Sequence, residues 1–236
     1  MSVFRFKKFV ICDDGASMKL GTDAVLLGAW ASITGANKIL DIGAGCGIIA
    51  IMLAQRTPDN TLIDAIELLE PDARQAALNV SQSPWPGKVN LIHADIKAFD
   101  PGFHYDVIVS NPPYFTKSLL PPAQGRRIAR HDGSLDSDEL LRSVIRLIAP
   151  AGKFNVILPA AEAIAFASKA KGVNLNLHRH TKFFTRLSKP QERSLMEFGF
   201  TDTHCTEDAL TLYEEKEQTS IGYQQLTGDF YLDKPL

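Results

Sequence analysis

The sequence predicts an α/β fold built on a largely parallel sheet, and two observations support this. Between residues 37 and 171, short apolar runs bounded by turn residues alternate with segments of helical length. Such alternation is typical of parallel strands joined by right-handed helical crossovers. A glycine-rich turn (41–47, DIGAGCG) also follows the first apolar run. Because open α/β sheets bind ligands outside the carboxyl ends of their strands, this turn marks a candidate site.

Each element of the first two thirds follows from a local pattern. Residues 4–11 suit a short strand or hairpin arm, and 22–31 suit a helix with Thr22 as N-cap. Short apolar runs of the kind expected for buried parallel strands lie at 38–42, 61–67, 89–93, 105–110 and 153–158. Further helices are expected at 48–55, from Pro71 to Ser81, at 136–148 with Asp136 as cap, and at 160–171 before Gly172.

The pattern changes after Gly172. Residues 174–185 and 193–201 alternate in polarity, which predicts two antiparallel strands that close the sheet. In the tail, 210–213 is a candidate strand and 222–231 a candidate helix. We therefore expect a single domain over 1–236, with an N-terminal arm and helix (1–36), a βα core (37–171) and a C-terminal extension on the substrate side (172–236).

Composition excludes several classes of protein. Of the 236 residues, 45% are hydrophobic and 22% are charged, which permits a packed core and argues against global disorder. Three widely spaced cysteines, Cys12, Cys46 and Cys205, form neither a disulfide framework nor a metal site, and they fit a reducing cytoplasmic setting. No apolar run is long enough to span a bilayer, so no membrane association is expected. With a net charge of −2, any contact with nucleic acid must be local.

The glycine turn itself carries chemical information. Gly43, Gly45 and Gly47 allow positive φ angles and a close approach of a ligand to the backbone. Asp41 ends the strand just before them. A carboxylate there would repel the pyrophosphate that a dinucleotide site holds at the helix N-terminus. The turn therefore favours a zwitterionic amino-acid cofactor, whose ammonium group a carboxylate attracts.

Two further carboxylates follow the next two strands. Glu67 ends the run at 61–67, a position from which an acidic side chain can bind ribose hydroxyls. Asp95 follows the run at 89–93, where it could accept a hydrogen bond from an adenine amino group beside Ile96. Each residue alone could be an ordinary turn residue, but acidic groups at successive strand ends favour a ligand site.

The fourth strand ends in SNPPY (110–114), a turn made rigid by two prolines. Together with KLGTDAVLLGAW (19–30), DIGAGCG, Glu67 and Asp95, it resembles the class I methyltransferases that act on planar amines. RRIARH (126–131) and GYQQLTGDFY (222–231) carry a narrower resemblance, to the bacterial valine-tRNA (adenine-37 N6)-methyltransferases. The similarity spans nearly the whole chain, although residues 172–215 diverge.

The resemblance implies a Rossmann-like, seven-stranded class I methyltransferase fold with an antiparallel C-terminal extension. It also implies S-adenosylmethionine as cofactor, no metal ion, and adenine N6 in the anticodon loop of a valine tRNA as the target. The implied cofactor site consists of Gly21, Thr22, Asp41, Gly43, Gly45, Gly47, Glu67, Leu68, Asp95, Ile96 and Asn111.

The same resemblance assigns roles around the target base. The Asn111 side-chain oxygen and the Pro112 carbonyl would accept hydrogens from the exocyclic amine, and Tyr114 would stack on the base. No strong general base is then required, and no histidine is assigned a catalytic role, with His93 expected to pack at its strand end. Two basic stretches would bind RNA phosphates, although solvated surface is the ordinary explanation for such charges. Their residues are Lys117, Arg126, Arg127, Arg130, Arg186, Lys189 and Arg193.

Other functions use similar motifs. A protein-glutamine methyltransferase also has NPPY, but its helical domain does not fit the roughly forty residues that precede the glycine turn. DNA adenine methyltransferases carry a target-recognition domain, guanine-N2 methyltransferases tend to have phenylalanine where Tyr114 stands, and a nicotinamide dehydrogenase is disfavoured by Asp41. An RNA-binding protein with a residual cofactor pocket is the non-enzymatic alternative. No obligate protein partner is inferred.

Overall fold

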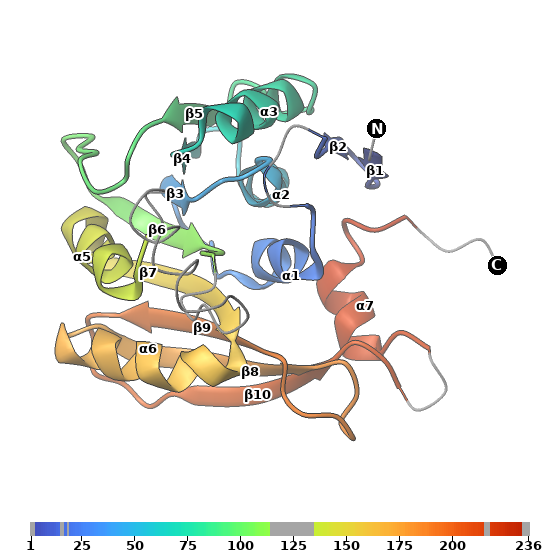
Figure 1. Ribbon diagram of the computed structural model, residues 1–236, viewed down its shortest axis with the longest axis vertical. Coiled ribbons are helices and arrows are strands. Elements are labelled where there is room, and N and C mark those ends of the chain that lie inside the picture. Colours follow the sequence, from blue (N-terminus) through green and yellow to red (C-terminus); the bar gives the residue numbers. More distant parts are fainter. Residues whose placement is uncertain (1–2, 15–16, 18, 114–134, 215–217, 233–236) are drawn as a thin grey trace, which may run out of the picture.

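The computed structural model describes residues 3–14, 17, 19–113, 135–214 and 218–232. Eight strands form its main sheet in the order β10-β8-β9-β7-β6-β3-β4-β5, from one edge to the other (Figure 1). Their bounds are β3 (Lys38–Ile42), β4 (Leu62–Glu67), β5 (Val89–His93), β6 (Tyr105–Ser110), β7 (Ile148–Pro159), β8 (Asn176–Phe184), β9 (Arg193–Gly199) and β10 (Thr206–Thr211). A separate antiparallel hairpin, β1 (Val3–Arg5) and β2 (Val10–Cys12), confirms the predicted N-terminal arm.

The sheet is largely parallel, as predicted. Within it, β9 is antiparallel to β7 and to β8, while the other neighbouring pairs are parallel. The expectation of seven strands was wrong, because β10 adds an eighth along β8, and the tail strand covers 206–211 rather than 210–213. The edge strand has the sequence TEDALT and its first four residues are exposed, so it lacks the apolar pattern that reveals a buried strand.

Helices cover both faces of the sheet. They are α1 (Thr22–Trp30), α2 (Ile48–Arg56), α3 (Glu70–Ser81), α5 (Ser137–Leu147), α6 (Ala160–Gly172) and α7 (Ile221–Thr227). On one face, Leu26 of α1, Ile51 of α2 and Ile39 of β3 belong to one core. On the other, Val144 of α5 and Phe154 of β7 belong to a second core with α6. The sheet therefore lies between two apolar layers, as its nearly continuous apolar strands require.

Local signals set most helix ends. Asp136 caps α5 in a capping box, with its side chain accepting from the Glu139 N–H and the Glu139 side chain accepting in return. Pro71 lies in the first turn of α3, where its missing N–H is not needed. Thr22 is not the N-cap of α1: the cap is Gly21, and Thr22 is the first helical residue. The predicted C-terminal helix is shorter than 222–231 and ends at Thr227.

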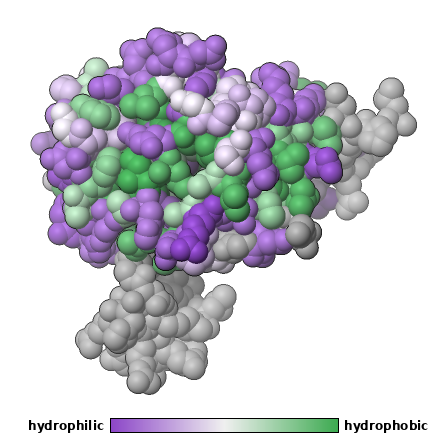
Figure 2. Space-filling view, turned by 90° about the horizontal axis from the view of Figure 1, so that it is seen from above, coloured by the Kyte–Doolittle hydropathy of each residue, from purple (hydrophilic) through white to green (hydrophobic). Residues whose placement is uncertain are grey.

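None of the helices in the described part of the chain is long and apolar enough to cross a bilayer. Viewed from above, apolar residues form patches between hydrophilic ones rather than a continuous apolar belt (Figure 2). Single exposed apolar side chains such as Leu78 on α3 and Phe4 on β1 are ordinary on a folded surface.

Two contacts fasten the end of α1 to β8. The Trp30 indole N–H donates to the Thr181 hydroxyl over 2.8 Å, and both residues are buried. The Arg179 guanidinium stacks 3.6 Å above the Trp30 ring and donates to the Trp30 carbonyl. Because α1 carries Gly21 and Thr22 at its other end, these contacts help to hold that end against the carboxyl edge of the sheet.

We predict that Thr181→Val lowers the free energy of unfolding by about 1–3 kcal/mol, since it leaves a buried indole N–H without its acceptor while nearly preserving side-chain volume. Urea unfolding followed by circular dichroism measures the change. Thr181→Ser retains the hydroxyl and serves as the matched control. Equal midpoints for the valine variant and the wild type would show that this hydrogen bond contributes nothing.

Candidate active site

Strands β3 and β6 are neighbours at the centre of the sheet, and the chain leaves them in opposite directions. After β3 it continues to β4, and after β6 it continues to β7 on the other side. The Ser110 hydroxyl at the end of β6 donates to the Ile42 carbonyl at the end of β3 over 2.9 Å. Gly43 and Asn111 come directly after these residues. The fold therefore brings the glycine turn and the NPPY turn together at a topological switch point, where α/β sheets bind ligands.

The glycine turn has the backbone geometry that its sequence predicted. Gly43, Gly45 and Gly47 have φ angles of 76°, 53° and 82°, which L side chains rarely adopt. A Cβ atom at Gly43 or Gly45 would have no neighbour within 4 Å, so open space lies above both residues. Gly47 differs, since its Cβ would lie 3.2 Å from the Ala76 Cβ. Gly47 thus allows α2 and α3 to pack closely and does not border either cavity of the site.

One cavity, of about 320 Å³, lies above the ends of β3, β4 and β5, and we call it the carboxylate cavity. Glu67 lines it and is 7% exposed. Its two carboxylate oxygens accept from the Gly45 N–H over 2.9 Å and from the Leu69 N–H over 2.8 Å. The side chain therefore fixes the glycine turn and keeps lone pairs available toward the cavity. The other residues that line the carboxylate cavity include Ile42, Leu68, Asp95, Ile96 and Pro112.

Asp95 follows β5 and also lines this cavity. Its carboxylate accepts from the Lys97 N–H over 2.9 Å and forms an ion pair of 3.6 Å with the Lys97 ammonium. The side chain is 39% exposed, so the ion pair is weakened by solvent. Asp95 is therefore oriented by its own turn and can still accept another hydrogen bond.

A second cavity, of about 360 Å³, lies between α1 and the β8–β9 loop, and we call it the helix cavity. Gly21, Thr22 and Arg193 line it. The Arg193 Nε donates to the Asp23 carboxylate over 2.7 Å, which joins the start of β9 to the first turn of α1. Three residues line both cavities: Gly43, Gly45 and Asn111. The structure thus places Asn111 where the two cavities meet.

Asp41 lies beneath the turn and lines neither cavity. It is fully buried, and one carboxylate oxygen accepts from the Ala50 N–H of α2 over 3.2 Å, while the other has no hydrogen-bond partner within the described part of the chain. Burial raises the pKa of the Asp41 carboxyl to about 7; the negative charge of Glu67 adds to the increase and the bond from Ala50 opposes it. A nearby cation would lower this pKa again.

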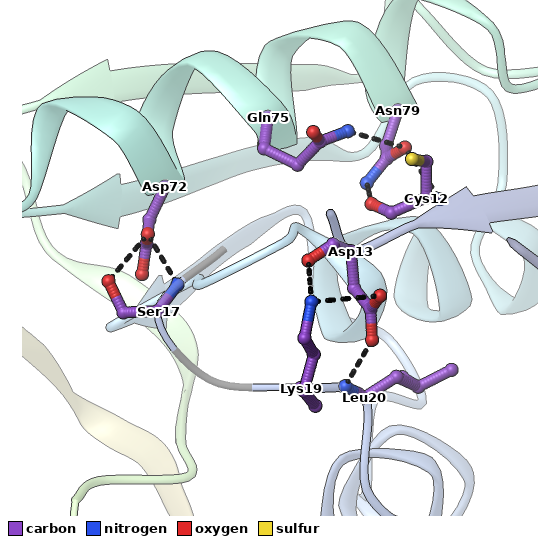
Figure 3. A network of polar contacts seen from close by, with 8 residues as sticks. All are labelled: Cys12, Asp13, Ser17, Lys19, Leu20, Asp72, Gln75 and Asn79. Atoms are coloured by element: carbon purple, nitrogen blue, oxygen red, sulfur yellow. Dashed lines mark hydrogen bonds and ion pairs between the residues drawn. The ribbon is translucent and has the colours of Figure 1, made fainter. Parts of the chain in front are cut away.

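Sequence reasoning missed a polar network that holds the N-terminal segment beside both cavities (Figure 3). The Asn79 side chain of α3 accepts from the Cys12 N–H and donates to the carbonyls of Cys12 and of Cys46 in the glycine turn. Asp72, one α3 turn away from Gln75, accepts from both the N–H and the hydroxyl of Ser17. Asn79 could have been noticed as a polar residue beside Val80 on the buried face of an otherwise amphipathic helix.

A neighbouring set of contacts shapes the start of the helix cavity. The buried Asp13 carboxylate accepts from the Leu20 N–H over 2.9 Å, and the Lys19 ammonium donates to the Asp13 carbonyl (Figure 3). Lys19 and Leu20 both line the helix cavity, and Ser17 lines the carboxylate cavity. The segment before α1 is therefore part of the walls of both.

Five of the predicted site residues cannot be placed relative to the cavities. Tyr114, Lys117, Arg126, Arg127 and Arg130 lie outside the described residues, so their roles stay predictions.

Of the predicted C-terminal residues, Arg186 and Lys189 lie in the β8–β9 loop, whose ends at Thr185 and Glu192 line the helix cavity. Phe183 is buried in the core and Phe184 is partly exposed, so only Phe184 of this pair could face a substrate. His93 was expected to pack at its strand end; instead its side chain is exposed, with Nε2 3.1 Å from the Leu68 carbonyl.

The residues fit a cofactor that combines a ribose with an amino acid. The buried Glu67 carboxylate at a strand end suits ribose hydroxyls, and the space above Gly43 and Gly45 allows a ligand to lie on the backbone. The buried oxygen of Asp41 lies under the same turn.

Comparison with known proteins agrees with this chemistry. Residues 18–146 match the Methyltransferase small domain family. Among solved structures, a predicted O-methyltransferase from Agrobacterium tumefaciens superposes with a TM-score of 0.68 at 16% identity, covering 88% of this chain and 96% of that one. A glycopeptide N-methyltransferase, MtfA, solved with S-adenosylmethionine, gives a TM-score of 0.54 at 15% identity, covering 80% of this chain and 97% of that one. These likenesses confirm the class I methyltransferase fold.

Closer relatives are similar over nearly the full length. The tRNA1(Val) (adenine(37)-N6)-methyltransferase of Bacteroides thetaiotaomicron is 40% identical over 97% of this chain and 97% of its own length. The enzyme of the same name from Aeromonas hydrophila is 42% identical over 98% of each chain. At this identity and coverage, the chain belongs to the family of tRNA1(Val) (adenine(37)-N6)-methyltransferases.

Proposed function

We propose that the enzyme transfers a methyl group from S-adenosylmethionine to N6 of adenine 37 in the anticodon loop of a valine tRNA. The position of Asn111 carries this proposal, because among the three residues that line both the carboxylate cavity and the helix cavity it is the one that has a side chain. A group that orients an amine must stand between the cofactor and the base, and only such a border position meets that requirement. Since a tRNA is a cytoplasmic molecule, we expect the enzyme to act in the cytoplasm.

The carboxylate cavity would hold the nucleoside part of the cofactor. Glu67 would accept hydrogen bonds from the ribose hydroxyls while it keeps its own bonds to the Gly45 and Leu69 N–H groups. Asp95 would accept from the adenine amino group, and Leu68 and Ile96 would contact the apolar faces of the base.

The methionine part would run over Gly43 and Gly45 toward the start of α1. There Gly21 and Thr22 border the helix cavity at a helix N-terminus, which favours the cofactor carboxylate. Asp41 would act through the turn, by attracting the ammonium group and by holding α2 through Ala50. Gly47 would not contact the cofactor; its role would be to let α2 and α3 pack closely.

Orientation is the main contribution that the chain makes to the reaction. The bound cofactor supplies an electrophilic methyl group. An exocyclic adenine amine is a weak nucleophile because its lone pair is delocalised into the ring. The Asn111 side-chain oxygen and the Pro112 carbonyl would accept its two hydrogens, so that the lone pair faces the methyl group, and the released proton passes to these acceptors or to water. Orientation of this kind can lower a barrier by up to about 7–11 kcal/mol.

RNA binding would come from local positive charge, because the net charge is −2. Arg186 and Lys189 belong to the β8–β9 loop, whose two ends, Thr185 and Glu192, line the helix cavity. Lys117, Arg126, Arg127 and Arg130, which follow the NPPY turn in the sequence, would bind phosphates on the other side of the target base. Tyr114 would stack on the extruded adenine, and a base in a loop is less costly to extrude than one in a duplex.

We predict that Glu67→Ala weakens S-adenosylmethionine binding by roughly ten- to a hundred-fold, since hydrogen bonds to a charged group are each worth about 1.5–3 kcal/mol. Isothermal titration measures the dissociation constant. Glu70→Ala is the matched control, because Glu70 is exposed, pairs with Arg74 and lies outside the cavity. A folded Glu67→Ala protein with unchanged affinity would remove Glu67 from the cofactor site.

We predict that Asn111→Ala nearly abolishes methyl transfer and leaves the affinity for S-adenosylmethionine within about two-fold of the wild type, on the orientation argument above. Single-turnover transfer and cofactor titration separate the two quantities. Turnover by the purified variant at the wild-type rate would show that the amine is positioned by other groups.

The substrate is tested by methyl transfer from labelled S-adenosylmethionine to total tRNA from a strain that lacks the enzyme. We expect labelled N6-methyladenosine after nucleoside analysis, at the adenine that follows the anticodon of valine tRNA. A glutamine-containing peptide and duplex DNA serve as competing acceptors. Label on either of these, or on a different nucleoside, would overturn the substrate, whereas binding of tRNA without any transfer would favour the non-enzymatic alternative.

A further inference from the structure

The C-terminal segment 222–231, one of the motifs on which the family resemblance rests, contributes nothing to the two cavities of the active site among the residues that line them. It forms α7 and the residues after it, and it lines a third cavity of about 750 Å³. We call this the tyrosine cavity. Lys7 of the N-terminal hairpin connection and Tyr213 after β10 line its other sides.

The lining of the tyrosine cavity suits a planar, polar ligand. Tyr213 is partly exposed and Tyr231 is 37% exposed, so both offer ring surface. Gln218 and Gln224 add side-chain amides; the Gln224 Nε2 donates to the Thr219 carbonyl over 2.6 Å, and the Gln218 amide and the Gln224 Oε1 can pair with the edge of a base. Among the described lining residues, Lys7 is the only charged one. Aromatic rings with amides and a cation are the groups that bind unpaired bases and their phosphates.

The rings are held in place. Tyr231 stacks on Tyr223 with ring centroids 6.3 Å apart and on Phe6 with centroids 5.8 Å apart. Phe6 and Tyr223 are themselves buried, at 5% each. A backbone hydrogen bond also links the N-terminal hairpin to the C-terminal segment, since the Lys7 N–H donates to the Phe230 carbonyl over 2.8 Å. A rigid aromatic surface loses little entropy when a base stacks on it.

The tyrosine cavity adjoins the helix cavity. Leu212 lines both cavities. The Tyr213 N–H donates over 3.0 Å to the carbonyl of Thr185, which lines the helix cavity. The Arg186 guanidinium lies 5.4 Å from the centroid of the Tyr213 ring. A strand of RNA that places its target amine at Asn111, where the carboxylate and helix cavities meet, would therefore reach the tyrosine cavity with a neighbouring nucleotide.

We propose that the tyrosine cavity binds one unpaired nucleotide of the RNA that flanks the target adenine. This inference rests on the proposed function. When the adenine leaves the stack, a neighbouring base loses its stacking partner. Stacking on Tyr213 or Tyr231 replaces that contact, and Arg186 beside Tyr213 contacts the connecting phosphate. The cavity thereby favours loops over duplexes, in which the flanking base is not free to enter.

The test uses a synthetic anticodon stem-loop of valine tRNA with a fluorescent end label. We expect Tyr213→Ala and Tyr231→Ala each to weaken its binding about five- to one-hundred-fold, because one stacked base is worth about 1–3 kcal/mol. Tyr213→Phe and Tyr231→Phe keep the rings and should stay within about three-fold of the wild type. The KM for tRNA should rise in the alanine variants, while kcat at saturating tRNA and the affinity for S-adenosylmethionine stay unchanged.

A second measurement needs no substitution. Stem-loops that carry 4-thiouridine at single loop positions are irradiated with the wild-type enzyme, and the attached peptides are identified by mass spectrometry. A crosslink from a position flanking the adenine to the peptides that contain Tyr213 or Tyr231 is expected. Unchanged RNA affinity in both alanine variants, or crosslinks that avoid these peptides, would overturn the inference. Failure of the proposed function is distinct, since the wild-type enzyme would then not methylate the stem-loop at all.

Discussion

The active site depends on the tie between two strand ends at the centre of the sheet. The Ser110 hydroxyl holds the end of β6 to the Ile42 carbonyl at the end of β3. The buried Ser110 hydroxyl needs a hydrogen-bond acceptor, and that acceptor belongs to Ile42, the residue directly before Gly43. The position of Asn111 relative to Gly43 is therefore fixed by the sheet rather than by a loop. A catalytic geometry needs this, since small displacements of an orienting group reduce rates strongly.

Side-chain contacts also fix the N-terminal segment and the start of α1 relative to the sheet. Asn79 joins Cys12 to Cys46 with a single buried amide, so the segment and the glycine turn share one support. Arg193 then ties the first turn of α1 to β9 through Asp23. Elements that are far apart in the sequence thus converge on one edge of the sheet. Removal of a buried side chain with several hydrogen-bond partners leaves all of those partners unpaired. A substitution of such a residue therefore costs more stability than the loss of a surface contact.

Much of this arrangement was predictable from the sequence, and the limits have physical causes. Apolar runs predicted the buried strands β3 and β6 to the residue, and also β5, which lies at the edge of the sheet and is only partly buried. The glycine turn and Glu67 could be placed together because carboxyl ends of parallel strands share an edge. The exposed strand β10 has no such signature, and its pairing with β8 arises from tertiary structure. Asn79 and Ser110 act through contacts over 33 and 68 residues, which no local pattern encodes.

Acidic and basic side chains are separated along the carboxyl edge of the sheet. This separation is compatible with binding of a polyanion by a chain whose net charge is −2. Carboxylates concentrate at the ends of β3, β4 and β5: Glu67 and Asp95 line the carboxylate cavity, and Asp41 is buried beneath the glycine turn. Arg186 and Lys189, to which we assign an RNA role by proposal, lie in the β8–β9 loop, beyond the helix cavity. A phosphate backbone would be repelled from the first region and attracted to the second, over distances within a few Debye lengths. If the proposed function holds, the carboxylates that bind the cofactor would also direct the RNA toward the helix cavity, so that orientation of the substrate would begin before any base is recognised.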